Sequence, residues 1–216
     1  FFDEQVRGQA WGLRTLAEAA LVTADRHPMK PVFQEQLKAN MAAYLKRHLG
    51  EIGEGGPGVN HAIIDIQREK VAPWQQDMMA IVLAHLAENG VEGAERLARW
   101  LAPFVVGRWN AESQGYCRAN APGYWLLHGW GKPITWAEFN RLNWPDQRSC
   151  AGVRWNDPNP DCAYCYTSIA RAALASMLNI GIAEAREPYD FIRLRTPNSM
   201  ANMAAEPTFA LAPRKP

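Results

Sequence analysis

The stretch APWQQDMMAIVLAHLAENGVEGAERLARWLAPFVV, residues 72–106, contains two consecutive helices of different kinds. In the first, apolar side chains from Met78 to Leu86 cover most of the cylinder, so this helix is expected to be enclosed by neighbours. The second is amphipathic, with leucines on one side and arginines on the other, which is typical of a surface helix. Pro73 suits a helix start and Gly90 a helix end. The stretch therefore predicts an αα-hairpin.

The same alternation of enclosed and surface helices recurs on both sides of this hairpin. Residues 4–23 are predicted as an enclosed helix, and residues 31–49 as a surface helix with one apolar stripe. A third enclosed helix is predicted at 163–181, with a shorter helix at 184–194. Between the hairpins lies a long irregular insertion, residues 107–161, with a short helix near 135–142. The pattern predicts an all-α domain over residues 1–195, a toroid-like or solenoid stack of αα-hairpins, and an extended Pro-rich tail at 196–216.

Composition argues against several functional classes. The 216 residues include 23 Lys and Arg against 22 Asp and Glu, and this balance argues against a nucleic-acid footprint. No apolar run approaches the roughly 18 residues of a membrane span. Phosphate-loop, dinucleotide, zincin and serine-hydrolase motifs are absent from the sequence, so we expect neither cofactor nor metal. The first residue is Phe1 rather than Met, which favours a processed chain or a piece of a larger protein.

The first turns of the enclosed helices carry polar and aromatic residues. If these helices are parallel, their N-terminal ends meet at one end of the molecule, where helix dipoles favour anionic groups. We therefore predict a common rim that binds a ligand. The candidates are Arg7, Gln9 and Trp11 in one helix, Trp74, Gln75, Gln76 and Asp77 in the next, and Tyr164 and Tyr166 in the third.

Two of these helices, RGQAWGLRTLAEA and APWQQDMMAIVLAHLAE, resemble inner helices of the (α/α) toroid carbohydrate-active enzymes, the six-hairpin glycosidases and toroid polysaccharide lyases. The resemblance is one of style over about residues 4–180. It implies a sugar-binding cleft at the N-terminal ends of the inner helices, a polysaccharide or glycan as partner, and lyase or hydrolase activity. A full toroid needs more hairpins than this chain supplies, so an incomplete toroid is one expectation. The alternative is a non-catalytic αα-repeat module that binds a partner or forms part of a larger assembly.

Two sets of residues are candidates for catalysis. Asp77 beside Trp74 is a candidate general acid or base, although an acidic residue near a helix start also stabilises the helix. In the loop GPGVNHAIIDI, a lyase would use His61 as base with Tyr124 as acid, and Asp65 lies in the same loop. The alternating apolar residues of this loop also fit a short hairpin strand with an exposed histidine.

The insertion contains more aromatic residues than a solvated linker needs. These residues either cover the open end of the helix stack as a second core or form a ligand platform, and large amphipathic rings serve both roles. From this segment we take Tyr124, Trp125 and His128 as candidate site residues. The aromatic and histidine residues concerned are Trp109, Tyr116, Tyr124, Trp125, His128, Trp130 and Trp136.

Four cysteines allow three pairings of two disulfides. We predict a Cys150–Cys162 bridge, because it would hold the polar loop AGVRWNDPNPD, and oxidised cysteines would imply an exported protein. A zinc site is disfavoured, since only one C-x-x-C occurs, between Cys162 and Cys165. A redox role for this C-x-x-C lacks a surrounding βαβ pattern.

Overall fold

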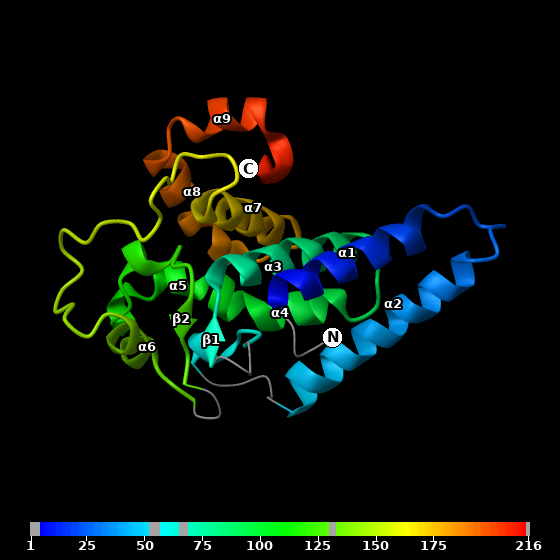
Figure 1. Ribbon diagram of the computed structural model, residues 1–216, viewed down its shortest axis with the longest axis horizontal. Coiled ribbons are helices and arrows are strands. Elements are labelled where there is room, and N and C mark those ends of the chain that lie inside the picture. Colours follow the sequence, from blue (N-terminus) through cyan, green and yellow to red (C-terminus); the bar gives the residue numbers. More distant parts are fainter. Residues whose placement is uncertain (1–4, 52–56, 65–68, 130–132, 215–216) are drawn as a thin grey trace.

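The computed structural model describes residues 5–51, 57–64, 69–129 and 133–214. The prediction of an all-α fold is confirmed (Figure 1). The helices are α1 (Val6–Val22), α2 (Lys30–Leu45), α3 (Pro73–Glu88), α4 (Ala94–Val105), α5 (Gly107–Asn110), α6 (Trp136–Asn143), α7 (Tyr166–Asn179), α8 (Arg186–Arg195) and α9 (Ser199–Ala205). Shorter helical turns are η1 (Lys46–Glu51), η2 (Gly58–Asn60), η3 (Glu112–Gln114), η4 (Arg118–Asn120), η5 (Ala183–Ala185) and η6 (Pro207–Phe209), and the strands are β1 (Lys70–Val71) and β2 (Leu126–Leu127).

The helices form hairpins whose first members are parallel. α1 packs on α2, α3 on α4 and α7 on α8, and α3 also contacts both α1 and α7. The backbone N–H of Arg7 donates to Oε1 of Gln75 at 2.9 Å, which joins the starts of α1 and α3. The rings of Trp74 and Tyr166 lie 6.0 Å apart and join the starts of α3 and α7. The predicted gathering of the enclosed helix starts at one end is therefore confirmed.

Helix α3 lies at the centre of this arrangement, between α1, α4 and α7 (Figure 1). Its side chains from Pro73 to Asp77 are all buried, as are Met79 and Leu83 further along. Gly90, which follows the helix with a positive φ of 72°, allows the chain to turn back into α4. The enclosed character predicted from the apolar cover of this helix is confirmed.

Part of the insertion packs against the helix stack and extends its hydrophobic core. Tyr116, Trp136 and Phe139 are buried; Trp136 and Phe139 pack on Phe104 of α4, and Tyr116 packs on Phe139. Thr135 and Glu138 form a capping box that starts α6 and orients its aromatic face. Trp109 is buried in the same core. These rings are therefore buried packing residues, as the core alternative predicted, but they form one core with the helices rather than a second one. Trp130 lies outside the described residues.

A two-stranded antiparallel sheet holds another part of the insertion next to the start of α3. β1 pairs antiparallel with β2, with Lys70 opposite Leu127 and Val71 opposite Leu126. Because β1 leads directly into α3 and β2 directly follows Trp125, this pairing fixes Tyr124 and Trp125 beside the helix starts. The predicted hairpin strand around His61 is wrong, since that segment forms the turn η2 and His61 is buried.

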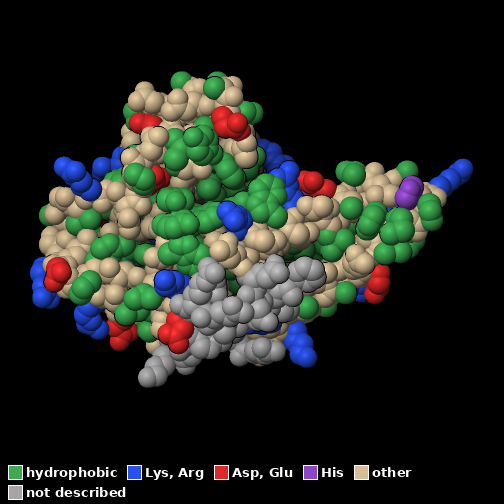
Figure 2. Space-filling model, in the orientation of Figure 1, with side chains coloured by type: hydrophobic (Ala, Val, Ile, Leu, Met, Phe, Trp, Pro, Cys, Tyr) green, Lys and Arg blue, Asp and Glu red, His purple; other side chains and the backbone are tan. Residues whose placement is uncertain are grey.

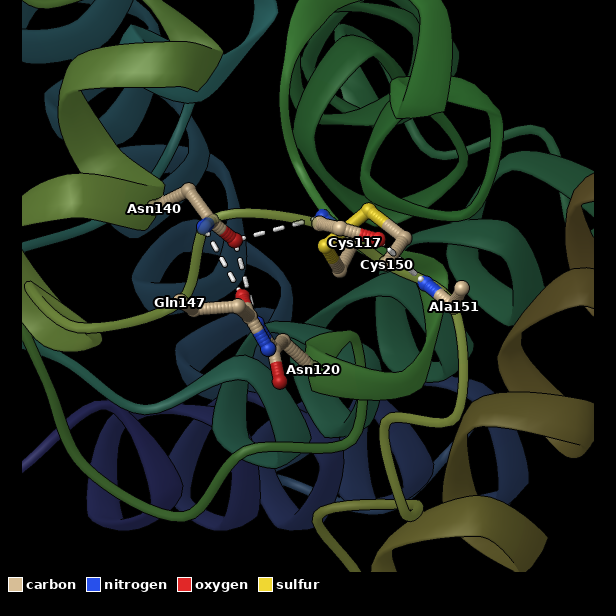
Figure 3. The surroundings of a disulfide bond; sticks show 7 residues. Cys117, Asn120, Asn140, Gln147, Cys150 and Ala151 are labelled. Atoms are coloured by element: carbon tan, nitrogen blue, oxygen red, sulfur yellow. Dashed lines mark hydrogen bonds between the residues drawn. A yellow bond between two sulfur atoms is a disulfide. The ribbon is translucent and has the colours of Figure 1, made fainter.

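The predicted Cys150–Cys162 bridge is also wrong. One disulfide joins Cys117 to Cys150, with a Cα–Cα distance of 5.2 Å (Figure 3). The other joins Cys162 to Cys165, with a Cα–Cα distance of 5.5 Å. Asn140 accepts the backbone N–H of Cys117 at 3.2 Å, and this bond holds that cysteine on the α6 side of the molecule near Cys150.

The loop after Cys150 is held without a bridge between its ends. Asp157 accepts bonds at 2.9 and 2.7 Å from the backbone N–H and hydroxyl of Thr167 in the first turn of α7. The backbone N–H of Asn156 donates to the carbonyl of Ala119 at 2.8 Å. Side-chain and backbone hydrogen bonds, rather than a Cys150–Cys162 disulfide, therefore attach this polar loop to the rest of the protein.

Two further boundaries differ from the prediction. The second helix continues past Leu45 as the π-helical turn η1 rather than ending near Leu49. The tail is not extended throughout, because residues 199–205 form α9, whose Met203 is buried against Arg171 of α7. An alanine-rich turn that buries one apolar side chain is enough to make this segment helical.

Candidate functional site

The starts of α1, α3 and α7 share one aromatic cluster, which we call the rim: Arg7, Trp74, Tyr124, Trp125 and Tyr166. The Trp74 and Tyr124 rings stack with centroids 6.1 Å apart and planes 12° apart. Tyr124 and Tyr166 stack at 5.4 Å, and Trp125 meets Tyr124 edge-on at 6.2 Å. The guanidinium of Arg7 lies 5.7 Å from the Trp74 ring centroid, within cation–π range. Three helix starts and one loop therefore present rings and a cation together.

The rim is open to solvent on the tyrosine side. Trp74 is only 8% exposed, whereas Tyr124 is 51% exposed and Tyr164, just before α7, is 68% exposed. Partial burial, with Tyr124 and Asp157 nearby, raises the pKa of Tyr166. In Figure 2, hydrophobic side chains gather between α7 and the starts of α1 and α3 on the face in view. Exposed rings beside a buried one form a platform with a fixed base.

Two buried polar atoms lie at the base of the rim. Within the described part of the chain, the indole Nε1 of Trp74 and the amide Nε2 of Gln75 have no hydrogen-bond acceptor. The Gln75 Oε1 atom is already used by the backbone N–H of Arg7. Buried donors of this kind are rare in native proteins, and a ligand or water that accepts from them is a usual explanation. The sequence predicted both residues at the start of this helix, but it did not predict these buried N–H donors.

Asp77 is not accessible to a ligand. Its carboxylate is 1% exposed and accepts from one guanidinium nitrogen of Arg108 at 2.7 and 2.5 Å. Arg108 is itself fully buried and also donates to the carbonyls of Ala121 and Val105. Burial raises the pKa of Asp77 to about 6 against the opposing effect of the Arg108 charge. The expectation that Asp77 lies in an open cleft beside Arg7 is therefore wrong, and its contacts are those of an internal ion pair.

The two residues of the other predicted catalytic pair, His61 and Tyr124, do not share a site. His61 is buried against Trp100 of α4, and its Nδ1 lies 2.7 Å from the carbonyl oxygen of that residue. Tyr124 lies in the rim against Trp74. Asp65 falls outside the described residues. The geometry gives His61 a structural bond and leaves Tyr124 as an exposed ring.

Several predicted ligand-binding residues hold the fold together instead. Gln76 exchanges two hydrogen bonds with the backbone of Ile63, at 2.9 and 2.8 Å. Gln9 accepts from the hydroxyl of Tyr44 at 3.0 Å, and both residues are buried. The Nε2 of His128 lies 2.9 Å from the carbonyl oxygen of Val59, and burial lowers the pKa of this histidine. These side chains tie the loops and α2 to the enclosed helices, so placing them on a ligand-facing rim is wrong.

Trp11 lies on a second concave surface, the inner groove, about one turn further along α1. This groove has a volume of about 490 Å³ and lies between α1, α3, the end of α7 and the segment after α9. Trp11 is 43% exposed, and the guanidinium of Arg14 lies 5.3 Å from its ring. The lining residues are Ala10, Trp11, Arg14, Glu18, Met78, Ile81, Val82, His85, Glu88, Ser176, Asn179, Thr208, Phe209, Ala210, Leu211, Ala212 and Arg214.

Apart from Trp11, the residues of the inner groove were missed as site candidates. Trp11, Arg14 and Glu18 lie at i, i+3 and i+7 on one face of α1, and Ile81, His85 and Glu88 lie at i, i+4 and i+7 on one face of α3. That spacing was detectable in the sequence. The contribution of the C-terminal segment was not, because no local pattern places residues 208–214 against helices more than a hundred residues earlier.

The described residues contain no helix with both the length and the apolar character needed to cross a bilayer. They also contain no group of three or more His, Cys, Asp or Glu side chains arranged to hold a metal ion.

Comparison of the chain with protein families, with curated proteins and with solved structures gives no match.

Proposed function

We propose that this protein binds a glycan at the rim. The observation that carries the proposal is the convergence of three parallel helix starts on stacked rings, of which Tyr124 is half exposed and Trp74 is buried below it. Aromatic faces take the apolar faces of sugar rings, and the tyrosine hydroxyls and the arginine supply polar contacts at the edges. The rim therefore has both components of a saccharide site.

Arg7 favours an acidic glycan over a neutral one. Its guanidinium lies over the rim tryptophan, and the side chain is exposed. A planar guanidinium pairs with both oxygens of a carboxylate, and the starts of α1 and α3 add the positive ends of two helix dipoles.

The proposal concerns binding rather than bond cleavage. Hydrolysis needs two accessible carboxyl groups and a lyase needs an accessible base. The Asp77 carboxylate is paired with Arg108 inside the protein, and His61 is buried against α4. Among the described residues predicted to be catalytic, only Tyr124 reaches solvent.

The proposal extends to architecture and location. We propose that α1, α3 and α7, each followed by a packed second helix, are part of an (α/α) toroid; the contacts of α3 with α1 and α7 support this arrangement. Two disulfides are compatible with an exported protein, since disulfides persist mainly in oxidising compartments. An exported glycan-binding protein is consistent with both features.

The proposal is tested by calorimetric titration with a panel of soluble acidic and neutral oligosaccharides. We expect binding by the wild type, and a loss of at least tenfold in affinity for Tyr124→Ala and Arg7→Ala. Leu194→Ala is the matched control, because Leu194 is 71% exposed and lies on α8. Absence of binding to every member of the panel, or equal affinity for Tyr124→Ala and the control, would overturn the proposal.

A further inference from the structure

The C-terminal segment of this chain, residues 206–214, forms one wall of the inner groove. It follows α9 and runs past the end of α7 with Phe209, Ala210, Leu211 and Ala212 lining the groove. The opposite wall is α1 with Trp11, Arg14 and Glu18, and the floor is the apolar face of α3. The groove therefore already holds an extended peptide along one side.

Three contacts hold this segment in place. Phe209 packs against the buried cluster of Ala72, Trp74 and Ile169. The Arg214 guanidinium forms an ion pair with the Glu88 carboxylate at the end of α3. The backbone N–H of Arg214 donates to Oδ1 of Asn179 at 2.8 Å. An aromatic side chain, a basic side chain five residues later and one backbone amide are thus recognised by three different groups of the groove.

The segment is weakly attached between these contacts. Ala210, Leu211 and Ala212 are exposed, and Phe209 is only half buried. The Arg214–Glu88 pair lies at the surface, where such pairs contribute little. Segments with few buried contacts open at low free-energy cost. The C-terminal segment is therefore the part of the groove most easily displaced.

The groove has room for a few side chains of an incoming peptide beside this segment. Its volume of about 490 Å³ is comparable to that of a typical ligand site. Met78, Ile81 and Val82 form an apolar floor, and the half-exposed ring of Trp11 stands opposite. An incoming peptide can contact this floor before the resident segment leaves, so exchange needs no prior opening.

We propose that the inner groove binds an extended peptide of another protein, with an aromatic residue followed five positions later by a basic residue, and that residues 206–214 occupy this site in its absence. The chemistry of the partner is taken from the contacts of the resident segment: a ring for the Trp74 cluster, a cation for Glu88 and a backbone amide for Asn179. The proposed peptide site shares the Trp74 cluster with the rim, but its ligand and its contacts at Glu88 and Asn179 differ from those of the rim.

The test uses the full chain and a fluorescent synthetic peptide with the sequence EPTFALAPR, residues 206–214. A tethered segment competes with a free peptide at an effective concentration of about a millimolar. Weakening the resident segment should therefore strengthen peptide binding. We expect Phe209→Ala to bind the peptide at least tenfold more tightly than the wild type, and Arg214→Ala about twofold to fivefold more tightly. Leu194→Ala should match the wild type.

The peptide itself is varied in the same assay. Replacement of its phenylalanine by alanine should weaken binding to the Phe209→Ala protein at least tenfold. Replacement of its arginine by glutamine should weaken binding to the Phe209→Ala protein, in which Glu88 is present. The same replacement should not weaken binding to the double variant Phe209→Ala with Glu88→Gln. Equal binding of a scrambled peptide, or no gain in affinity for both Phe209→Ala and Arg214→Ala, would overturn the proposal.

Two controls separate the other outcomes. Arg214→Ala, which should strengthen peptide binding, should leave glycan affinity unchanged, because Arg214 pairs with Glu88 at the end of α3 away from the rim. Failure of glycan binding and failure of peptide binding are therefore distinguishable. Sedimentation of the wild type over a range of concentrations tests whether the segment instead seats on a second copy of the chain. A concentration-dependent dimer that Phe209→Ala abolishes would contradict a foreign partner, and a monomer throughout supports one.

Discussion

Two aromatic regions of this molecule have similar composition and opposite surroundings. The interior cluster around Tyr116, Trp136 and Phe139 is closed on all sides, and the Tyr116 hydroxyl donates to the carbonyl of Asn120 at 3.0 Å. The rim around Tyr124 ends in solvent. Tyr124 and Trp125 of the rim come from the same insertion as the interior cluster, so aromatic density alone does not distinguish packing from binding. The difference is whether a ring lies against α4 and α6 or over the starts of the parallel helices.

The largest expected effect belongs to the ion pair beneath both regions. Arg108 packs beside the rings of Phe104 and Trp109 and reaches Asp77 in α3. Removal of one partner leaves a buried uncompensated charge, so Asp77→Asn should lower the free energy of unfolding by about 3–5 kcal/mol. Denaturant unfolding measures this change.

The exposed pair Glu95–Arg99 provides the control, since both its side chains are at least half exposed. Glu95→Gln should cost only about 0.3–0.5 kcal/mol. Similar losses for Asp77→Asn and Glu95→Gln would mean that the internal pair does not fix α3 to the insertion.

Truncation of one ring in each region measures the contrast directly. Phe139→Ala removes a fully buried side chain and should cost about 3–5 kcal/mol, because a cavity remains in a packed core. Tyr124→Ala removes a half-exposed ring and should cost under about 1 kcal/mol. Thermal and denaturant unfolding of the two variants side by side give the order, and a reversed order would contradict the division into core and rim.

The two disulfides should also differ in their contribution to stability. Cys117–Cys150 closes a loop with a sequence separation of 33, whereas Cys162–Cys165 spans a separation of 3. Chain entropy predicts stabilisation of about 4 kcal/mol for the first bridge and about 2 kcal/mol for the second. Paired Cys→Ser variants, checked by mass spectrometry for the remaining bridge, test this ratio. An equal loss for both pairs would show that native-state contacts outweigh loop closure.

A smaller effect is expected from pH, because a histidine is enclosed beside the aromatic core. His48 of η1 packs on Trp100 at 4.8 Å, and within the described residues neither ring nitrogen has a hydrogen-bond partner. Burial, helped by the Arg47 charge, lowers its pKa from 6.5 to about 4. The unfolded state therefore binds the proton more readily, and stability should fall as pH decreases from about 6.5 to 4.

The slope from His48 is at most about 1.4 kcal/mol per pH unit. The raised pKa of Asp77 acts in the opposite direction, since its contribution is lost as pH rises from 3.8 to 6. The difference in unfolding free energy between the wild type and His48→Phe isolates the histidine. A difference that does not change between pH 7 and pH 4 would contradict a neutral buried His48.

The sequence predicted the helices better than the site. Apolar periodicity predicted the enclosed helix that begins at Pro73 and the parallel arrangement of the enclosed helices. This was possible because a helix that is buried on several sides has apolar residues on those sides of its own sequence. It could not show that Asp77 faces Arg108, since that pairing joins residues 31 positions apart through the tertiary fold. The prediction of the cysteine pairing failed for the same reason. The polar loop suggested that a disulfide must hold it in place, but Asp157 holds it through hydrogen bonds to Thr167.

The indole N–H groups of Trp74 and Trp109 give the most direct test of the central claim, that the rim and not the aromatic interior binds a ligand. Both are buried, and in the described part of the chain neither has a hydrogen-bond acceptor. We would follow the two indole signals by nitrogen–proton correlation spectroscopy during titration with acidic oligosaccharides. The predicted result is a saturable shift of the Trp74 signal with the Trp109 signal unchanged. A stationary Trp74 signal at saturation, or equal shifts of both, would contradict the assignment of the rim as the binding site.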